Sequence, residues 1–348
     1  MSVGAAFAWS SAISKRIQPD GVAHAARRVP ILRKFAITAA IAAGLLGPIA
    51  GATDPQTFVY KRVGDLEIKA DVYRPEGVGG LRPVLVWIHG GALMSGRRES
   101  AAGHPLKEAV LAHGGVVVSI DYRLAPETKL PEIIGDVEDA FRWLRESGPE
   151  LFAADPERVV VAGSSAGGYL ALVSGYRVHP RPRAIVSYWG YGDLIGEWYS
   201  KPSTHARHQR IFLSRDEAYA LVSGPPVSNA SDRPGQGGAK FYEHCRQHGI
   251  WPREVSGGWD PVDDTEKFFP FMPLKNVTKD FPPTLLMHGM KDTDVPVENS
   301  VLMAAALKEH GVEHRLITDP DADHGSNWSE QARAAIHRAA LEFVLSHW

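Results

Sequence analysis

Residues 158–173 read RVVVAGSSAGGYLALV, and this stretch decides the fold of the chain. A β-branched run, 159–161, leads into the pentapeptide Gly163-Ser164-Ser165-Ala166-Gly167, and an apolar helical pattern follows it. The pentapeptide fits G-x-S-x-G, a motif that needs a strand before it and a helix after it, because the sharp turn between them lifts the serine hydroxyl clear of the sheet. The sequence therefore predicts a strand, a strained turn at Ser165 and a helix, with Ser165 as a candidate nucleophile.

Strand and helix patterns alternate from residue 57 to the end of the chain, which predicts an α/β fold with an eight-stranded, mostly parallel sheet flanked by helices. The first two strands alternate as an antiparallel hairpin does, and the later ones are short apolar runs typical of strands buried on both faces. Apolar residues at 137, 140, 141 and 144 predict a helix that packs on the sheet. The predicted strands are 58–62, 66–73, 84–89, 116–121, 159–162, 184–188, 284–288 and 314–317.

Residues 190–283 interrupt this alternation of strands and helices, between predicted strands 6 and 7. The segment is rich in aromatic residues and contains a Gly/Pro/Ser-rich stretch, 223–238, that predicts a surface loop. An insertion at this edge of a sheet is placed to form a cap or lid over a site. We expect most of its aromatic side chains to form the core of the insertion and a few to line a substrate pocket. The segment 190–283 is called the insert below.

A serine hydroxyl becomes nucleophilic only when a base takes its proton, so a histidine and an orienting carboxylate must follow in the order Ser, Asp or Glu, His. Asp292 and Asp294 lie just beyond the strand that ends near His288, and His324 lies in a short loop after the last strand. Asp292 is the predicted orienting acid, and Asp294 is the alternative, with capping of the helix near residue 296 as its structural role. His324 is the predicted base, whereas His288 is expected to be a packed residue at the strand end.

An attack on a carbonyl also needs N–H donors for the oxyanion. His89-Gly90-Gly91-Ala92 follows the strand 84–89, where glycines allow the backbone N–H groups to turn inward. The predicted donors are the N–H groups of Gly91, Ala92 and Ala166.

Together with Asp121-Tyr122-Arg123-Leu124-Ala125-Pro126-Glu127, these motifs resemble the α/β-hydrolase superfamily, in particular carboxylesterases similar to hormone-sensitive lipase and the acetyl- and feruloyl-esterase group. The resemblance covers roughly residues 57–348. It implies an α/β-hydrolase fold, a Ser165–His324–Asp292 catalytic triad, and a scaffold role for Arg123 and Glu127. Ala92 replaces a glycine of the usual oxyanion loop, and its methyl group narrows the site.

Composition limits the other functions. The chain has 348 residues, 44% hydrophobic and 22% charged, with a formal net charge of −2, so we expect no nucleic-acid partner and no stable membrane insertion of the mature form. The one cysteine, Cys245, is expected to pack in the core. No metal-ligand spacing, P-loop or dinucleotide fingerprint occurs in the sequence, so neither a metal nor a cofactor is expected.

The N-terminus predicts a targeting segment. Arginines and a lysine at 27–34 precede the apolar run 35–46 and the small residues Ala50-Gly51-Ala52, which together fit a secretory signal peptide cleaved after Ala52. A retained amphipathic helix is the alternative. We expect residues 1–52 to be a signal peptide with an upstream segment, residues 53–348 to be the catalytic domain, and the protein to be periplasmic or secreted.

The prediction is a serine carboxylesterase that acts through an acyl-enzyme on small to medium esters, with aromatic and acetylated esters as candidates. Two alternatives stay open: an amidase or exopeptidase of the prolyl-oligopeptidase type, and a catalytically silent hydrolase fold that acts as a binding protein.

Overall fold

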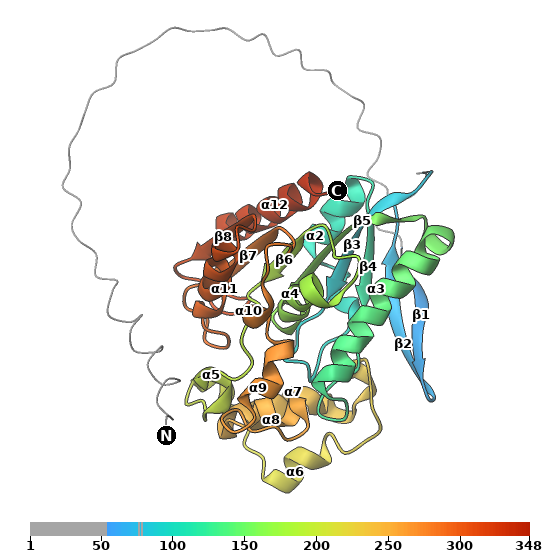
Figure 1. Ribbon diagram of the computed structural model, residues 1–348. Coiled ribbons are helices and arrows are strands. Elements are labelled where there is room, and N and C mark those ends of the chain that lie inside the picture. The colour runs from blue at the N-terminus through green and yellow to red at the C-terminus, as the bar shows by residue number, and fades with distance from the viewer. Residues whose placement is uncertain (1–53, 76, 78) are drawn as a thin grey trace, which may run out of the picture. The chain divides into compact units, whose positions relative to one another are not determined.

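An eight-stranded sheet forms the centre of the structure, with helices on both of its faces (Figure 1). The computed structural model describes residues 54–75, 77 and 79–348. The predicted signal peptide, residues 1–52, and its cleavage site after Ala52 lie outside these residues.

The strand order in the sheet is β1-β2-β4-β3-β5-β6-β7-β8. β2 runs antiparallel to both β1 and β4, and every other neighbouring pair is parallel. The prediction of eight mostly parallel strands with an antiparallel hairpin at the start is therefore confirmed. The strands are β1 (Gln56–Val63), β2 (Leu66–Tyr73), β3 (Arg82–Ile88), β4 (Val116–Ile120), β5 (Ala154–Ser164), β6 (Ile185–Tyr188), β7 (Thr284–Gly289) and β8 (His314–Asp319).

Both faces of the sheet are covered because its central strands carry apolar side chains in both directions. On β3, Val84, Val86 and Ile88 pack into one hydrophobic core, and Leu85 and Trp87 pack into a second. Helices α3, α4 and α11 contribute to the first core, and α2 and α12 contribute to the second. Their bounds are α2 (Pro105–Ala112), α3 (Leu130–Phe152), α4 (Ala166–Arg177), α11 (Glu298–Glu309) and α12 (Glu330–Ser346), with the 3-10 helix η1 (Arg98–Ala101) before α2.

The helix predicted from the apolar residues at 137, 140, 141 and 144 is α3. Val137, Ala140, Phe141 and Leu144 are all buried on it, so the 3.6-residue period located the core face of this helix correctly. The helix ends where Ala153 adopts a left-handed conformation, with φ of 57°.

The insert lies between β6 and β7, as predicted, and is helical. In Figure 1 its helices α6 to α9 gather below the sheet. The stretch 223–238, predicted as a loop, contains two short 3-10 helices and the start of α7. The elements are α5 (Glu197–Ser200), η2 (Ala206–His208), α6 (Arg215–Ala220), η3 (Ala230–Asp232), η4 (Pro234–Gln236), α7 (Gly237–His248), α8 (Trp251–Ser256), α9 (Thr265–Phe268), η5 (Phe269–Phe271) and α10 (Pro273–Asn276).

Candidate active site

Ser165 occupies the sharp turn between β5 and α4. Its backbone has φ of 55° and ψ of −121°, a strained conformation for a residue other than glycine. The turn has no room for larger neighbours, since a Cβ atom on Gly167 would lie 2.0 Å from the carbonyl oxygen of Ile88, and one on Gly163 would lie 2.3 Å from the carbonyl oxygen of Gly167. The predicted strand, strained turn and helix are therefore all present.

Loops at the ends of three strands bring Ser165, His324 and Asp292 together. The Nε2 atom of His324 lies 2.9 Å from Ser165 Oγ, and its Nδ1 atom lies 2.7 Å from Asp292 Oδ2. With Nδ1–H donated to the carboxylate, Nε2 is free to accept the serine proton; this tautomer is assigned from the hydrogen bonds. This arrangement would allow Ser165 to act as a nucleophile, His324 as a general base and Asp292 as an orienting acid.

The side chain of Asp292 is fully buried and is bonded through both of its oxygens. Oδ1 accepts the backbone N–H groups of Asp294 and Val295, at 2.9 and 2.8 Å. Oδ2 accepts from His324 and lies 3.1 Å from His288 Nε2. Burial by itself would raise the pKa of Asp292, but the bonds to His288 and His324 lower it below its ordinary value, so the group stays a carboxylate at neutral pH.

His288 is buried at the end of β7, where its imidazole contacts the carboxylate of Asp292. Its Nε2 atom also lies 2.9 Å from the carbonyl oxygen of Val295, and its Nδ1 atom lies 2.7 Å from Ser300 Oγ. The expectation that His288 is a packed residue at the strand end fits this environment.

Asp294, the alternative acid, does not contact Nδ1 of His324. Its Oδ2 atom lies 3.8 Å from Nε2 instead. The suggested capping role is also wrong, since α11 begins at Glu298 with Val297 as its N-cap. Asp294 binds the insert, as described below.

The loop after β3 contains residues in a left-handed backbone conformation. Gly91 and Ala92 have φ of 113° and 55°, and both line the same cavity as Ser165. Ala166, the third predicted donor, is the first residue of α4 and directly follows Ser165. The indole N–H of Trp251, in the insert, donates to the carbonyl oxygen of Ala92 at 3.0 Å. The roles of Gly91, Ala92 and Ala166 as donors stay predictions.

A cavity of about 350 Å³ opens in front of Ser165, and much of its wall is polar. Trp189 and Tyr242 are its aromatic residues. Other aromatic side chains of the insert pack on one another, with Tyr199 stacked on Trp251 at a centroid distance of 3.9 Å. The cavity is lined by Gly90, Gly91, Ala92, Ser95, Ser164, Ser165, Trp189, Arg207, His208, Arg210, Ala239, Tyr242, Glu243, Asp294 and His324.

Charged residues of the insert, which were not predicted from the sequence, bind the two loops that carry Asp292 and His324. Arg207 Nη2 donates to Asp323 Oδ2 at 2.9 Å, and Arg246 Nη1 donates to Asp294 Oδ1 at 2.7 Å. Asp323 Oδ1 in turn accepts the backbone N–H of His324 at 2.7 Å. No local motif marks Arg207 or Arg246, because only the fold brings them to these loops.

Arg123 and Glu127 make structural contacts. Arg123 Nε donates to Asp136 of α3 at 2.8 Å, and Glu127 pairs with Arg233 of the insert. Cys245 is buried, in agreement with its predicted packing role.

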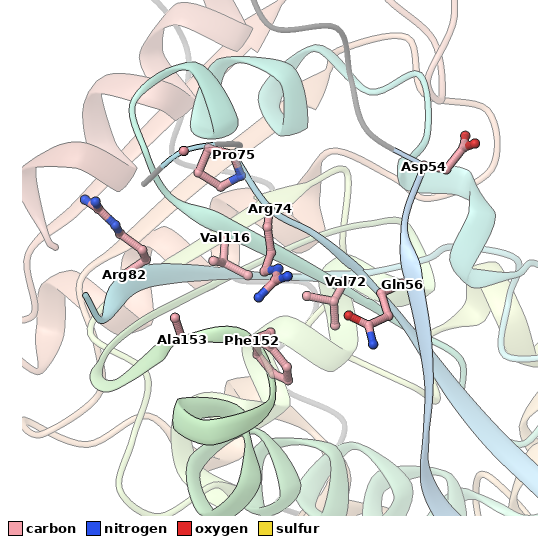
Figure 2. Close-up of a pocket in the computed structure, with 10 residues that line it drawn as sticks. Asp54, Gln56, Val72, Arg74, Pro75, Arg82, Val116, Phe152 and Ala153 are labelled. Carbon is pink, nitrogen blue, oxygen red and sulfur yellow. The ribbon is translucent and has the colours of Figure 1, made fainter. Parts of the chain in front are cut away.

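A cavity of about 460 Å³ lies at the opposite edge of the sheet, where the parallel strands begin (Figure 2). Its walls include Val72, Arg74, Val116 and Phe152. Ligand sites in parallel sheets form at the carboxyl ends of the strands. Ser165 lies at that end, whereas this cavity lies at the other.

Within the described ranges, no cluster of three His, Cys, Asp or Glu side chains is arranged to bind a metal ion. None of the helices there is both long and apolar enough to span a bilayer.

Two family models match parts of the chain. The BD-FAE family model matches residues 70–192, which include the oxyanion loop and Ser165. The prolyl oligopeptidase family model matches residues 239–348, which include Asp292 and His324.

The curated relatives are much longer proteins. A non-reducing polyketide synthase of Stachybotrys bisbyi is 40% identical over 292 residues, which is 74% of this chain and 13% of the relative. A second, from Penicillium rubens, is 28% identical over 305 residues, or 75% of this chain and 12% of the relative. The chain thus spans roughly an eighth of the length of these two relatives.

Solved structures share the fold at low sequence identity. A protein of unknown function from Staphylococcus aureus subsp. aureus Mu50 superimposes with a TM-score of 0.65 at 21% identity, covering 84% of this chain and 98% of that one. Esterase 2 of the planctomycete Thermogutta terrifontis superimposes with a TM-score of 0.58 at 22% identity, covering 86% and 93%. The same esterase phosphorylated by paraoxon gives 0.59 at 20% identity, covering 87% and 97%.

Proposed function

This chain belongs to the α/β-hydrolase superfamily, and on that premise we propose that it is a serine carboxylesterase. The observation that carries the proposal is the pair of contacts on His324, 2.9 Å from Ser165 Oγ and 2.7 Å from Asp292 Oδ2, at the wall of a cavity that the oxyanion loop also lines. A serine, a histidine, a carboxylate and backbone N–H donors are together sufficient to hydrolyse an ester through an acyl-enzyme.

The proposed reaction has two halves. Ser165 Oγ attacks the ester carbonyl while His324 Nε2 takes its proton, and the N–H groups of Gly91, Ala92 and Ala166 bind the oxyanion. The tetrahedral intermediate collapses when His324 returns the proton to the leaving alcohol, which produces the acyl-enzyme. Water then attacks the acyl carbonyl while His324 Nε2 takes its proton. The second tetrahedral intermediate collapses when His324 returns this proton to Ser165 Oγ, which releases the carboxylic acid and restores the free serine.

Substrates are proposed to be small to medium esters, because the cavity of about 350 Å³ is of the size that holds a small ligand. Two aromatic side chains, Trp189 and Tyr242, offer apolar surface in a wall that also carries charged and hydroxyl side chains. Aromatic and acetylated esters are therefore both suitable test substrates.

The test is hydrolysis of p-nitrophenyl acetate together with labelling by a fluorophosphonate probe. Wild-type protein should hydrolyse the ester and take up the probe, and Ser165→Ala should lose both, with turnover reduced by several orders of magnitude. Failure of the folded wild type to label would overturn the proposal and favour a catalytically silent binding protein. The phosphorylation of Thermogutta terrifontis esterase 2 by paraoxon supports the choice of an organophosphorus probe.

An amidase or exopeptidase is the second candidate, favoured by the prolyl oligopeptidase match over residues 239–348. Matched p-nitrophenyl acetate and p-nitroacetanilide distinguish the two, and an acetyl thioester adds a third arm because the curated relatives are polyketide synthases. A higher kcat/KM on the anilide than on the ester would favour the amidase.

Export is proposed on the sequence of residues 27–52 alone. Intact-mass measurement of protein recovered outside the cytoplasm tests it, since cleavage after Ala52 leaves a chain that begins at Thr53.

A further inference from the structure

Asp294 is a carboxylate held in place through one of its two oxygens. Oδ1 accepts hydrogen bonds from His208 Nε2 at 2.9 Å, Tyr242 Oη at 2.7 Å and Arg246 Nη1 at 2.7 Å, all from the insert. Burial by itself would raise the pKa of Asp294, but the bond from His208, the neighbouring His324 and the charge of Arg246 hold it well below its ordinary range. The group is therefore an ionised acceptor with a fixed orientation.

The other oxygen, Oδ2, accepts none of these three bonds and lies near the imidazole of His324. It is 3.8 Å from His324 Nε2 and 4.0 Å from Arg207 Nη1, both longer than a hydrogen bond. Arg207 is held by its other nitrogens, with Nε donating to Thr293 Oγ1 at 3.0 Å and Nη2 donating to Asp323 Oδ2 at 2.9 Å. Asp294, Arg207 and His324 all line the cavity of Ser165.

These distances place a hydrogen-bond acceptor and a donor next to the departing half of the substrate. His324 Nε2 returns its proton to the leaving oxygen, so that oxygen must lie within hydrogen-bond reach of Nε2. The atoms two and three bonds beyond it then come near Asp294 Oδ2 and Arg207 Nη1. A ligand oxygen between these two atoms can donate to the carboxylate and accept from the guanidinium.

Because one side of this position is negatively charged and the other is positively charged, it favours a neutral ligand group. Asp294 repels a carboxylate, and Arg207 repels an ammonium, whereas a hydroxyl both donates and accepts. Unlike an ether oxygen, the hydroxyl can satisfy the buried carboxylate.

We propose that Asp294 and Arg207 form a leaving-group subsite that selects esters whose alcohol carries a free hydroxyl on the carbon next to the ester-bearing carbon, that is, monoesters of 1,2-diols and polyols. This inference rests on the proposed esterase function, because it concerns the alcohol that Ser165 displaces.

The experiment compares 2-hydroxyethyl acetate with 2-methoxyethyl acetate, which differ only in the hydroxyl hydrogen and its methyl replacement. The readout is the ratio of their kcat/KM values within each variant, which cancels any general loss of activity. A hydrogen bond to a charged group predicts a ratio of roughly 10 to 100 for the wild type. Asp294→Asn and Arg207→Met should each bring the ratio close to 1. Arg253→Met, a change at an exposed insert arginine that pairs with Asp260 outside this cavity, should leave it unchanged.

The possible results distinguish failure of the proposed subsite from failure of the proposed esterase function. A wild-type ratio near 1, or a ratio that both variants retain, overturns the subsite, as does a preference for acetylcholine over 2-hydroxyethyl acetate. If Asp294→Asn does not fold, as judged by its melting curve, Arg207→Met decides alone, because Arg207 is partly exposed. Absence of hydrolysis of every ester, p-nitrophenyl acetate included, together with absence of fluorophosphonate labelling, overturns the esterase function instead.

Discussion

Trp251 donates its indole N–H to the carbonyl oxygen of Ala92 across 3.0 Å, which fixes the loop after β3 to the insert. Trp251 is fully buried and stacks on Tyr199. The loop that presents the proposed oxyanion donors is thus supported by a residue far away in the sequence.

Trp251→Phe should lower kcat for p-nitrophenyl acetate by about 10- to 100-fold with little change in KM, because a small displacement of the oxyanion donors weakens transition-state binding. It should also cost about 1–3 kcal/mol of unfolding free energy, since a buried carbonyl loses its donor. Steady-state kinetics and urea unfolding measure both. Trp259→Phe, which alters packing against Phe268 and Phe271 elsewhere in the insert, is the control and should leave kcat unchanged. Equal kcat values for Trp251→Phe and wild type would contradict this role.

Asp292→Asn should reduce kcat by about 10⁴-fold, because an amide in place of the carboxylate no longer selects the His324 tautomer with a proton on Nδ1. Ester hydrolysis measures the loss, and near-UV circular dichroism checks that the fold is intact. A loss of less than tenfold would show that another group orients His324.

Gly167→Ala should destabilise the protein by about 3 kcal/mol or more, because the new methyl group would meet the Ile88 carbonyl oxygen at 2.0 Å and the elbow would have to move. The matched control is Gly135→Ala inside α3, where nothing lies within 4 Å of the new Cβ. That change should raise stability by about 0.5–1 kcal/mol, since alanine favours the helix. Thermal unfolding of both variants decides, and similar effects from the two would refute the steric argument.

Asp323 should contribute stability that is lost in acid. Burial opposes its ionisation, but hydrogen bonds from the Thr293 and His324 backbone and from Arg207 lower its pKa to about 2. Because this is below the value of about 4 for an unfolded chain, the contribution is present above pH 4 and disappears between about pH 4 and 2. The stability difference between wild type and Asp323→Asn should therefore shrink as the pH falls from 5 to 2.

Asp321→Asn is the control for this pH dependence. Asp321 pairs with Lys291 at the exposed surface, with 77% and 65% of the two side chains accessible, so its loss should change little at any pH. Urea unfolding at several pH values compares the two variants. A difference for Asp323→Asn that stays constant with pH would contradict the assignment.

The central strands could be predicted from the sequence because each contains a local run of apolar residues, and β1 and β2 could be predicted because polar and apolar residues alternate along them. Asp292 and His324 could be located because the order of motifs fixes which strand ends must meet. Arg207 and Asp323 could not be linked, since they lie 116 positions apart and neither belongs to a motif. Rings of the insert such as Tyr199 and Trp251 stack on one another, in line with the expectation that most of its aromatic side chains form its own core. That Tyr242 would reach the cavity could not be predicted, because composition does not show which side chains the fold turns towards it.

The three bonds from the insert to Asp294 Oδ1 have a consequence for engineering. Replacing residues 190–283 with the corresponding segment of another hydrolase would remove all three donors at once and leave an uncompensated carboxylate inside the protein, which is strongly destabilising. Residues 190–283 and the loop 292–295 therefore have to be exchanged together. A chimera built to change substrate range has to carry both from the same parent.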